Sequence, residues 1–253
     1  MTSVSNAAVG AYLAGNAAAK ARHGMNEAIA RLSTGVRAMY GGDAGGASAA
    51  MQIRADGKSA AIAARNIEDG ISFLQAGESL LLELAALNTR LRELRVQDLN
   101  ADTLSAGDEA AISAEEDAVL AAGNLIDKAK FNGTDLLGGT VAITYDHDGA
   151  MTTLSADATI TLADTSITVI DATTTDIQEA LGEMAAGLSA LKGHQASNYA
   201  LAANFEAAAA RIADTDFARS SANLAKFSIL NQSAMAMVSQ ANQAQAAVLA
   251  VLQ

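Results

Sequence analysis

Cysteine, proline and tryptophan are absent from this chain of 253 residues, and aromatic residues make up only 4% of it. Without cysteine, the protein has no disulfide, no thiolate nucleophile and no zinc–thiolate site. Alanine and other small side chains dominate the 51% apolar fraction, and small side chains favour close approach of helices over a globule built around large ones. The composition therefore predicts long, packed helices.

Long hydrophobic runs are missing as well. The sequence contains no run of about 18 apolar residues, which is the length that indicates a membrane span. We therefore expect no membrane insertion. No basic start followed by an apolar stretch and a cleavage site is present either. If the protein is secreted, we expect a route that uses no cleaved signal.

Charge is distributed unevenly. Residues 1–43 carry a net +2 and residues 211–253 a net +1, which leaves −15 in the middle against a total of −12. This acidic middle disfavours nucleic acid as a partner, because phosphate binding requires a basic surface. The near-neutral ends, rich in Ala and Gln, favour burial against other chains, whereas the middle favours water.

Helical periodicity dominates the first half of the chain. Apolar residues recur mostly at three- and four-residue steps from Ala44 to about Leu99, which predicts one long helix. Ser105, followed by Asp108, is a helix start signal, and a second helix should run from there to about Lys130. We expect residues 131–133, Phe-Asn-Gly, to end it, because Asn and Gly tolerate the left-handed conformation.

The pattern changes between residues 139 and 175. Alternating Val, Ile and Thr residues predict a small β-hairpin unit of three or four strands around residues 141–145, 160–162 and 167–169, with Asp148-Gly149 as a turn. From Asp176 to Ile212 a heptad seam predicts coiled-coil packing against the long helices upstream. We predict a mainly α fold, in which N- and C-terminal segments form a coiled-coil-like rod of long antiparallel helices that carries a small β-hairpin insert.

The two ends are apolar on one face but poor in large side chains. Burying five large residues of the C-terminal end would contribute roughly 7–15 kcal/mol, whereas fixing some forty backbone residues costs on the order of 40–80 kcal/mol. We therefore expect ends that are largely disordered until they meet neighbours. The predicted self-assembly residues are Leu32, Val36, Leu224, Phe227, Val238, Val248 and Leu252.

These patterns divide the chain into five predicted segments. Residues 1–43 form an N-terminal assembly segment that pairs with a C-terminal assembly helix at 213–253. The helical rod comprises residues 44–138 and 176–212, with the hairpin insert at 139–175 between them.

Several motifs in order give the chain a specific resemblance. Residues 28–37 (AIARLSTGVR), 65–72 (RNIEDGIS) and 130–137 (KFNGTDLL) resemble N-terminal flagellin motifs, and residues 222–224 (ANL) and 241–244 (ANQA) resemble C-terminal ones. The chain resembles a bacterial flagellin of short form, lacking the large outer variable domains of longer members. The resemblance covers nearly the whole length.

The resemblance implies a structural subunit that polymerises into the flagellar filament for swimming motility, with a hook–filament junction protein of the flagellum as the alternative. The implied location is extracellular, in the filament. The implied partners are other copies of the chain in a helical homopolymer, an export chaperone and the type III export apparatus, and the hook–filament junction and cap proteins.

An enzyme is the third functional class considered, and the sequence offers little for it. The three histidines, His23, His147 and His194, stand far apart without a shared motif. Asp146-His147-Asp148-Gly149 suggests either a metal or acid–base cluster or a solvated hairpin tip, and the second interpretation is favoured. We expect no catalytic residues, no metal site and no cofactor.

The resemblance also implies a surface for immune recognition. Flagellins seen by the vertebrate Toll-like receptor specific for them carry a Gln-Arg-x-Arg-Glu-Leu motif on the long rod helix, and residues 89–94 (TRLREL) are similar to it. The implied recognition residues are Arg90 and Leu94, with Glu115 as the acidic counterpart on the next helix. The alternative is that these residues serve only subunit contacts along the filament.

Overall fold

A computed structural model describes residues 2–37, 42–155 and 160–251. The chain divides into two compact units. One unit is built from the two ends of the chain, and the other is built from its continuous middle. Unit 1 consists of Met1–Arg54 and Glu206–Gln253, and unit 2 of Ala55–Phe205. Each unit therefore has its own internal packing.

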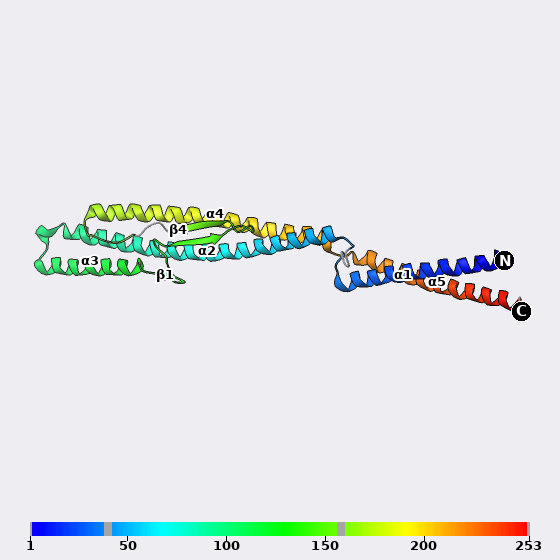
Figure 1. The fold of residues 1–253 in the computed structure, drawn as a ribbon. Coiled ribbons are helices and arrows are strands. Elements are labelled where there is room, and N and C mark those ends of the chain that lie inside the picture. The colour runs from blue at the N-terminus through cyan, green and yellow to red at the C-terminus, as the bar shows by residue number, and fades with distance from the viewer. Residues whose placement is uncertain (1, 38–41, 156–159, 252–253) are drawn as a thin grey trace. The chain divides into compact units, whose positions relative to one another are not determined.

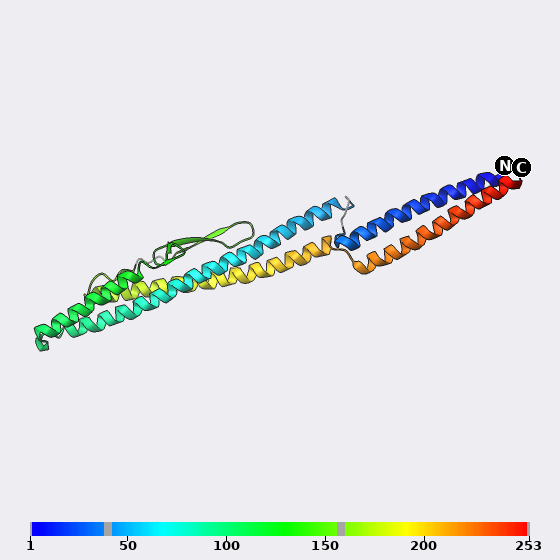
Figure 2. The ribbon, with the colours of Figure 1, turned by 90° about the horizontal axis from the view of Figure 1, so that it is seen from below.

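Long helices account for most of the described chain (Figures 1 and 2). The helices are α1 (Thr2–Thr34), α2 (Ala44–Asp98), the short 3₁₀ helix η1 (Ala101–Thr103), α3 (Ala106–Ile126), α4 (Ile167–Ala213) and α5 (Phe217–Val251). The strands are β1 (Lys130–Phe131), β2 (Thr134–Asp135), β3 (Thr140–Thr144) and β4 (Met151–Ser155). The predicted mainly α fold with a small hairpin is confirmed.

Unit 2 is held together by the apolar stripes of α2 and α4. The stripe of α2 includes Ile67, Leu74 and Leu81, and it meets the α4 residues Ile177, Met184 and Leu191 in one cluster whose members are almost fully buried. Burial of apolar side chains at helical spacing is the main stabilising contribution here. These three α4 residues lie in the range 176–212 of the predicted heptad seam, and they face the core.

The β3–β4 hairpin lies on α2 at Gly70. A Cβ added at Gly70 would come 3.1 Å from both Ile143 Cγ1 and Leu154 Cδ1, so any larger residue would require these hairpin side chains to move by a few tenths of an ångström. Ile143 and Leu154 are both buried members of the unit 2 core. Figure 1 shows the strands running alongside α2 and α4.

The start of α3 is confirmed, but its predicted end is wrong. Ser105 and Asp108 form a reciprocal capping box at the N-terminus of α3, whereas the helix ends at Ile126 rather than near Lys130. Asn132, with a φ of 50°, and Gly133, with a φ of 85°, form the turn of the β1–β2 hairpin. Two successive left-handed residues match the twist of a two-residue hairpin loop. Asn132 and Gly133 therefore form a hairpin turn and not the end of a helix.

The β insert is smaller than predicted. Only β3 and β4 pair, with Thr140 opposite Ser155 and Thr144 opposite Met151, around the predicted turn at Asp148-Gly149. Ile160 and Leu162 are buried but lie outside any strand. The prediction of three or four strands was therefore wrong for the described residues.

Residues 167–175 form the first turns of α4 instead of a strand. Asp164 Oδ1 accepts hydrogen bonds from the backbone N–H groups of Thr165 and Ser166, at 2.6 and 3.3 Å, and the helix follows. Ile170 and Thr173 are both buried, at a three-residue step that suits a helix face. Tertiary burial thus overrides the β propensity of a run rich in Ile, Val and Thr.

Unit 1 is a pair of antiparallel helices, α1 and α5, whose backbones run close together (Figure 2). Small side chains make this approach feasible, and the buried ones are Ala14, Ala18, Ala21, Ala28 and Ala234. Both ends are helical and paired within one chain, whereas the sequence predicted disorder until neighbours are met. The reason for the difference is that each terminal helix supplies the other's first neighbour.

Within the described part of the chain, one helix is long and apolar enough to cross a membrane, judged by length and composition alone. The most apolar 18-residue window of α2 has a mean hydropathy of 1.3, although charged residues interrupt every long apolar run in this helix. The core face of α2 is occupied by α4 and the hairpin. A single helix of this kind is weak evidence for a membrane span, because ordinary core helices pass the same test.

Candidate functional site

Unit 1 exposes many large apolar side chains. They lie on both terminal helices and at the start of α2, and their exposed fractions run from 45% at Leu230 to 72% at Met51. The set comprises Val9, Tyr12, Leu13, Ile29, Met51, Phe217, Ile229, Leu230, Met235 and Met237. Exposed apolar surface on this scale marks a site of interaction with another protein surface.

The predicted self-assembly residues lie within this helix pair. Leu32, Val36, Leu224, Phe227 and Val238 are all half-buried, so each contributes both to the pairing of α1 with α5 and to the outer surface. Val248 lies in α5. Leu252 lies outside the described residues.

Gly24 and Phe227 fix one point of the α1–α5 contact. A Cβ added at Gly24 would lie 2.6 Å from the Phe227 ring, which is closer than any real side-chain contact. The aromatic ring of α5 therefore rests directly on the backbone of α1. Phe227 was predicted from the sequence, but Gly24 was not. A glycine has no side chain and therefore does not contribute to a periodic pattern of apolar residues.

A group of polar contacts joins the α1–α2 and α4–α5 connections. The Arg37 N–H donates to the Ala213 carbonyl at 2.7 Å, and the Thr215 N–H donates to the Gly35 carbonyl at 2.8 Å. Arg37 also pairs with Asp43 at 2.5 Å, a carboxylate whose pKa is lowered by the Gly46 N–H and by Arg37.

Arg54 of α2 makes a further contact with the α4–α5 connection, an ion pair with Asp214 at 2.9 Å. These contacts were not predicted from the sequence. The partners Arg54 and Asp214 stand 160 positions apart, and no local signal connects them.

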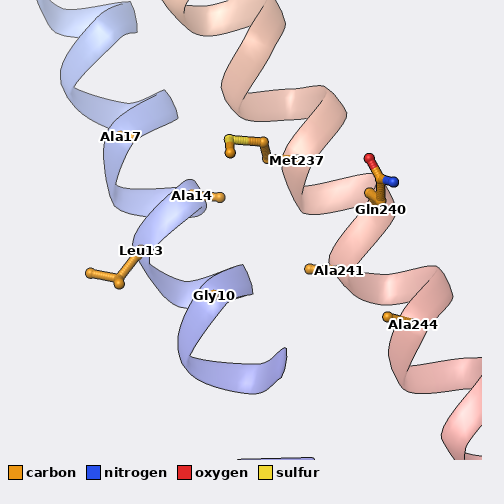
Figure 3. Close-up of a pocket in the computed structure, with 8 residues that line it drawn as sticks. All are labelled: Gly10, Leu13, Ala14, Ala17, Met237, Gln240, Ala241 and Ala244. Carbon is orange, nitrogen blue, oxygen red and sulfur yellow. The ribbon is translucent and has the colours of Figure 1, made fainter. Parts of the chain in front are cut away.

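An apolar groove of about 630 Å³ lies between α1 and α5. We call it the Gly10 groove, and Figure 3 shows how its two walls face each other. The α1 wall presents Gly10, Leu13, Ala14 and Ala17, and the α5 wall presents Met237, Gln240, Ala241 and Ala244. Each wall follows the three- and four-residue steps of one helix face, and five of the eight lining residues are Gly or Ala, which are too small to close the space.

In unit 2, Arg90 of α2 and Glu115 of α3 are brought together. Arg90 Nε and Nη2 donate hydrogen bonds to one Glu115 oxygen, at 2.9 and 2.5 Å. Arg90 Nη1 donates to Glu93 at 3.0 Å, and the hydrogen bonds that Arg90 donates to Glu115 and then to Glu93 raise the pKa of the guanidinium. The Arg90 side chain remains 43% exposed, so the pair is open to solvent.

Leu94 does not belong to this exposed surface, and its assignment as a recognition residue needs correction. Its side chain is only 1% exposed and packs with Leu91, Val119 and Ile170 in a small core cluster between α2, α3 and α4. Leu94 lies three residues after the buried Leu91 and shares its core-facing stripe, whereas Arg90 lies at the exposed edge of that stripe. A leucine in that position stabilises unit 2 and has no surface left to fill a receptor pocket.

In the β3–β4 turn, Asp146 and His147 are half-buried, which is less solvated than expected for a hairpin tip, whereas Asp148 is exposed. Asp146 Oδ1 lies 2.6 Å from His147 Nδ1, and the His147 ring packs against Phe205 of α4 with centroids 5.6 Å apart. The hydrogen bond to Asp146 raises the pKa of His147, with Asp148 and Asp56 adding to it against desolvation. This arrangement docks the hairpin tip on α4.

Three side chains could offer ligand atoms to a metal ion in this turn, since those of residues 146–148 lie within 4.8 Å of one another. One imidazole nitrogen is already engaged by Asp146, and all three residues come from a single short turn. The contacts therefore support a structural role for His147, and the group carries no argument for catalysis.

Comparison with known proteins assigns both halves of the chain to one family. The family model for the bacterial flagellin N-terminal helical region matches residues 6–142, and that for the C-terminal helical region matches residues 167–252. The flagellin of Halalkalibacterium halodurans is 32% identical over 248 residues, covering 89% of this chain and 91% of the relative.

Two further relatives extend the same pattern. Flagellin FlaB2 of Treponema pallidum is 28% identical over 260 residues, covering 88% of this chain and 91% of the relative. The flagellin of Bacillus subtilis is 27% identical over 268 residues, covering 84% and 88% respectively.

Proposed function

Because this chain belongs to the bacterial flagellin family, we propose that its polymerisation is driven by unit 1, through the apolar surface that α1 and α5 leave exposed. The chain is a structural subunit of the flagellar filament, and it serves motility. The proposal concerns the part of the molecule that makes the contacts between subunits.

The observation that carries this proposal is the exposure of large apolar side chains on a helix pair. Ile229 is 63% exposed and Leu230 is 45% exposed on α5, and the described residues of the chain leave both uncovered. Covering a large apolar side chain contributes about 1.5–3 kcal/mol. Several such side chains per subunit are sufficient to hold neighbouring copies together.

The test uses truncation and point substitution in parallel. Deleting residues 213–253 should leave a helical protein that no longer elongates wild-type filament seeds, as followed by light scattering and negative-stain microscopy. Ile229→Ser should slow elongation strongly, whereas Gln232→Ser, an exposed polar position on the same helix, should not. Normal filaments from the truncated chain would show that unit 1 does not drive assembly.

The hook–filament junction alternative gains no support. Both family-model matches are to flagellin regions, and the three relatives described above are flagellins. Junction proteins and cap proteins remain proposed partners, to be met by unit 1 at the two ends of the filament.

Export follows as a second part of the proposal. The filament is extracellular, and we propose that the chain leaves the cell through the flagellar type III apparatus without a cleaved signal. A chaperone that covers the apolar face of α5 before assembly fits the exposure of Met235 and Met237, 53% and 65%. Mass spectrometry of secreted filaments should then find Met1 or Thr2 at the N-terminus, whereas a start near residue 25 would indicate cleavage.

Immune recognition is the third part, and it rests on the exposed Arg90–Glu115 pair without Leu94. A guanidinium held by a neighbouring carboxylate is a pre-ordered group of the kind that dominates interfaces. Receptor signalling by monomeric Arg90→Ala should fall below that of wild type, whereas Arg92→Ala, which breaks only an exposed ion pair with Asp171, should signal normally. Equal responses from wild type, Arg90→Ala and Arg92→Ala would show that Arg90 is not a recognition residue. Arg90 would then serve subunit contacts or neither of the two roles.

A further inference from the structure

The β1–β2 hairpin carries the only asparagine in the sequence that is followed by a glycine, Asn132. Asn132 and Gly133 form the turn of this short hairpin, which follows α3 (Figure 1). Both residues are exposed, and their φ values of 50° and 85° lie in the left-handed region. The turn therefore presents an asparagine side chain and the next backbone nitrogen to water.

The backbone nitrogen of Gly133 is unusually accessible. A Cβ added at Gly133 would meet nothing within 4 Å, and neither the Asn132 amide nor the Gly133 N–H makes a hydrogen bond to another described residue. Any residue other than glycine would place a Cβ beside this nitrogen. The nitrogen is thus able to reach the side-chain carbonyl carbon of Asn132.

We propose that Asn132 is a site of spontaneous deamidation, with water as the co-reactant. The Gly133 nitrogen loses its proton to hydroxide and attacks Asn132 Cγ. The N–Cγ bond forms and closes an imide ring, the Cγ–Nδ2 bond breaks, and Nδ2 takes a proton from water and leaves as ammonia, which regenerates hydroxide. A water molecule then opens the ring at either carbonyl and leaves an aspartyl or an isoaspartyl residue at position 132.

Opening of the hairpin sets the rate of this reaction. Ring closure requires the Asn132 backbone to rotate, because the imide fixes the torsion between its Cα and carbonyl carbon at a value that a hairpin turn does not use. Each strand has only two residues, and a two-stranded hairpin is marginally stable in water. Phe131 opposes opening through its edge-on contact with the buried Phe73, with ring centroids 6.1 Å apart.

The isoaspartyl product changes the structure more than the aspartyl product does. Its side-chain methylene becomes part of the main chain, so the lengthened loop no longer matches the twist of the two strands. The pairing of Lys130 with Asp135 then loses its register. The Leu136 N–H, which donates to the Ala129 carbonyl at 3.0 Å next to the hairpin, becomes more accessible to solvent exchange.

The experiment incubates the purified full-length chain at mildly alkaline pH and follows positions 132 and 100 by peptide mass spectrometry, with fragmentation that distinguishes aspartyl from isoaspartyl products. Asn100 is the internal control, because it is exposed but is followed by alanine, and its Nδ2 donates to Thr103 at 2.7 Å. Asn132→Gly is the inert variant, since Gly-Gly supports the same turn without an amide.

We expect position 132 to convert several-fold faster than position 100, at a rate proportional to the hydroxide concentration. Phe131→Ala, which removes the contact with Phe73, should raise the rate because the hairpin opens more often. Incubated wild type should show faster hydrogen exchange at Leu136 than fresh wild type. Asn132→Gly should show the same exchange before and after incubation.

Equal conversion at positions 132 and 100, or no conversion at position 132, would overturn the proposal. Conversion of Phe131→Ala at the wild-type rate would show that hairpin opening does not control the reaction. Isoaspartyl formation with unchanged exchange at Leu136 would overturn the predicted loss of register.

Discussion

Asn88 of α2 donates a hydrogen bond to Thr174 of α4, with 2.9 Å between Nδ2 and Oγ1. The same Nδ2 donates to the Ile170 carbonyl oxygen at 3.0 Å, and the Asn88 side chain is buried. Because a buried amide has few alternative partners, this contact fixes the alignment of α2 against the first turns of α4. It forms a polar link between helices that otherwise meet through apolar side chains.

Replacing Asn88 with Ala should therefore lower the stability of unit 2. The substitution removes two hydrogen bonds and leaves a gap, and we expect a loss of about 1–3 kcal/mol in the free energy of unfolding by urea. Thr89→Ala is the matched control, since Thr89 is exposed and bonds only to Ala85 in its own helix. A loss for Asn88→Ala no larger than that of the control would show that the link does not fix the helices.

Protonation of His147 should hold the hairpin tip on α4. The hydrogen bond that protonated His147 donates to Asp146 raises the pKa of His147 above 6.5 in the folded protein. The resulting stabilisation is fully present below the unfolded pKa and is lost as the pH rises through the folded pKa. NMR titration should place the midpoint above 6.5, and Asp146→Asn should lower it.

Asp102→Asn, a substitution in η1, is the control for this titration and should leave the His147 midpoint in place. An unchanged midpoint in Asp146→Asn would contradict the assignment of the shift to Asp146.

Glu116 should destabilise unit 2 at neutral pH. Its side chain on α3 is 6% exposed, and one carboxylate oxygen is buried without a hydrogen-bond partner. Desolvation raises the pKa of Glu116, and Asp98 raises it further against the opposing effect of Arg95. Since the folded pKa is raised, the protonated form is favoured on folding, and stability falls as the pH rises through that pKa.

Glu116→Gln removes this charge while keeping the shape of the side chain. We expect the variant to have a higher Tm than wild type at pH 7, with the difference shrinking as the pH falls below the folded pKa. Glu109→Gln, at an exposed position on the same helix, should show no such dependence. A variant less stable than wild type at every pH would indicate that Glu116 has a favourable partner.

The capping box of α3 should be measurable on its own. Ser105→Ala removes the side-chain acceptor for the Asp108 N–H and should cost about 1 kcal/mol in unfolding by urea. Hydrogen bonds from Ser105 lower the pKa of Asp108, so the contribution of the box is present above the unfolded pKa and is lost as the pH falls through the folded pKa. The difference between Ser105→Ala and wild type should thus shrink in acid, and a constant difference would exclude Asp108 from the cap.

The sequence by itself determined those features that depend on neighbouring residues. The apolar steps that include Leu74, Leu81 and Leu84 specify a helix with one buried face, and all three side chains are buried in the structure. The Ser105–Asp108 cap and the Asp148-Gly149 turn follow from backbone preferences within four residues. The order of the end motifs was likewise sufficient to identify the family.

Tertiary structure alone decided the features that depend on distant residues. Residues 167–175 became helical because Ile170 could be buried with Leu91 and Val119, and Leu94, which the motif suggested as a recognition residue, is buried in the same cluster. The pairing of Arg54 with Asp214 and the fit of Phe227 on Gly24 join residues that no local pattern relates. The physical reason is that propensity and spacing fix what one segment can do, whereas burial against a segment far along the chain selects which of those options has the lowest free energy.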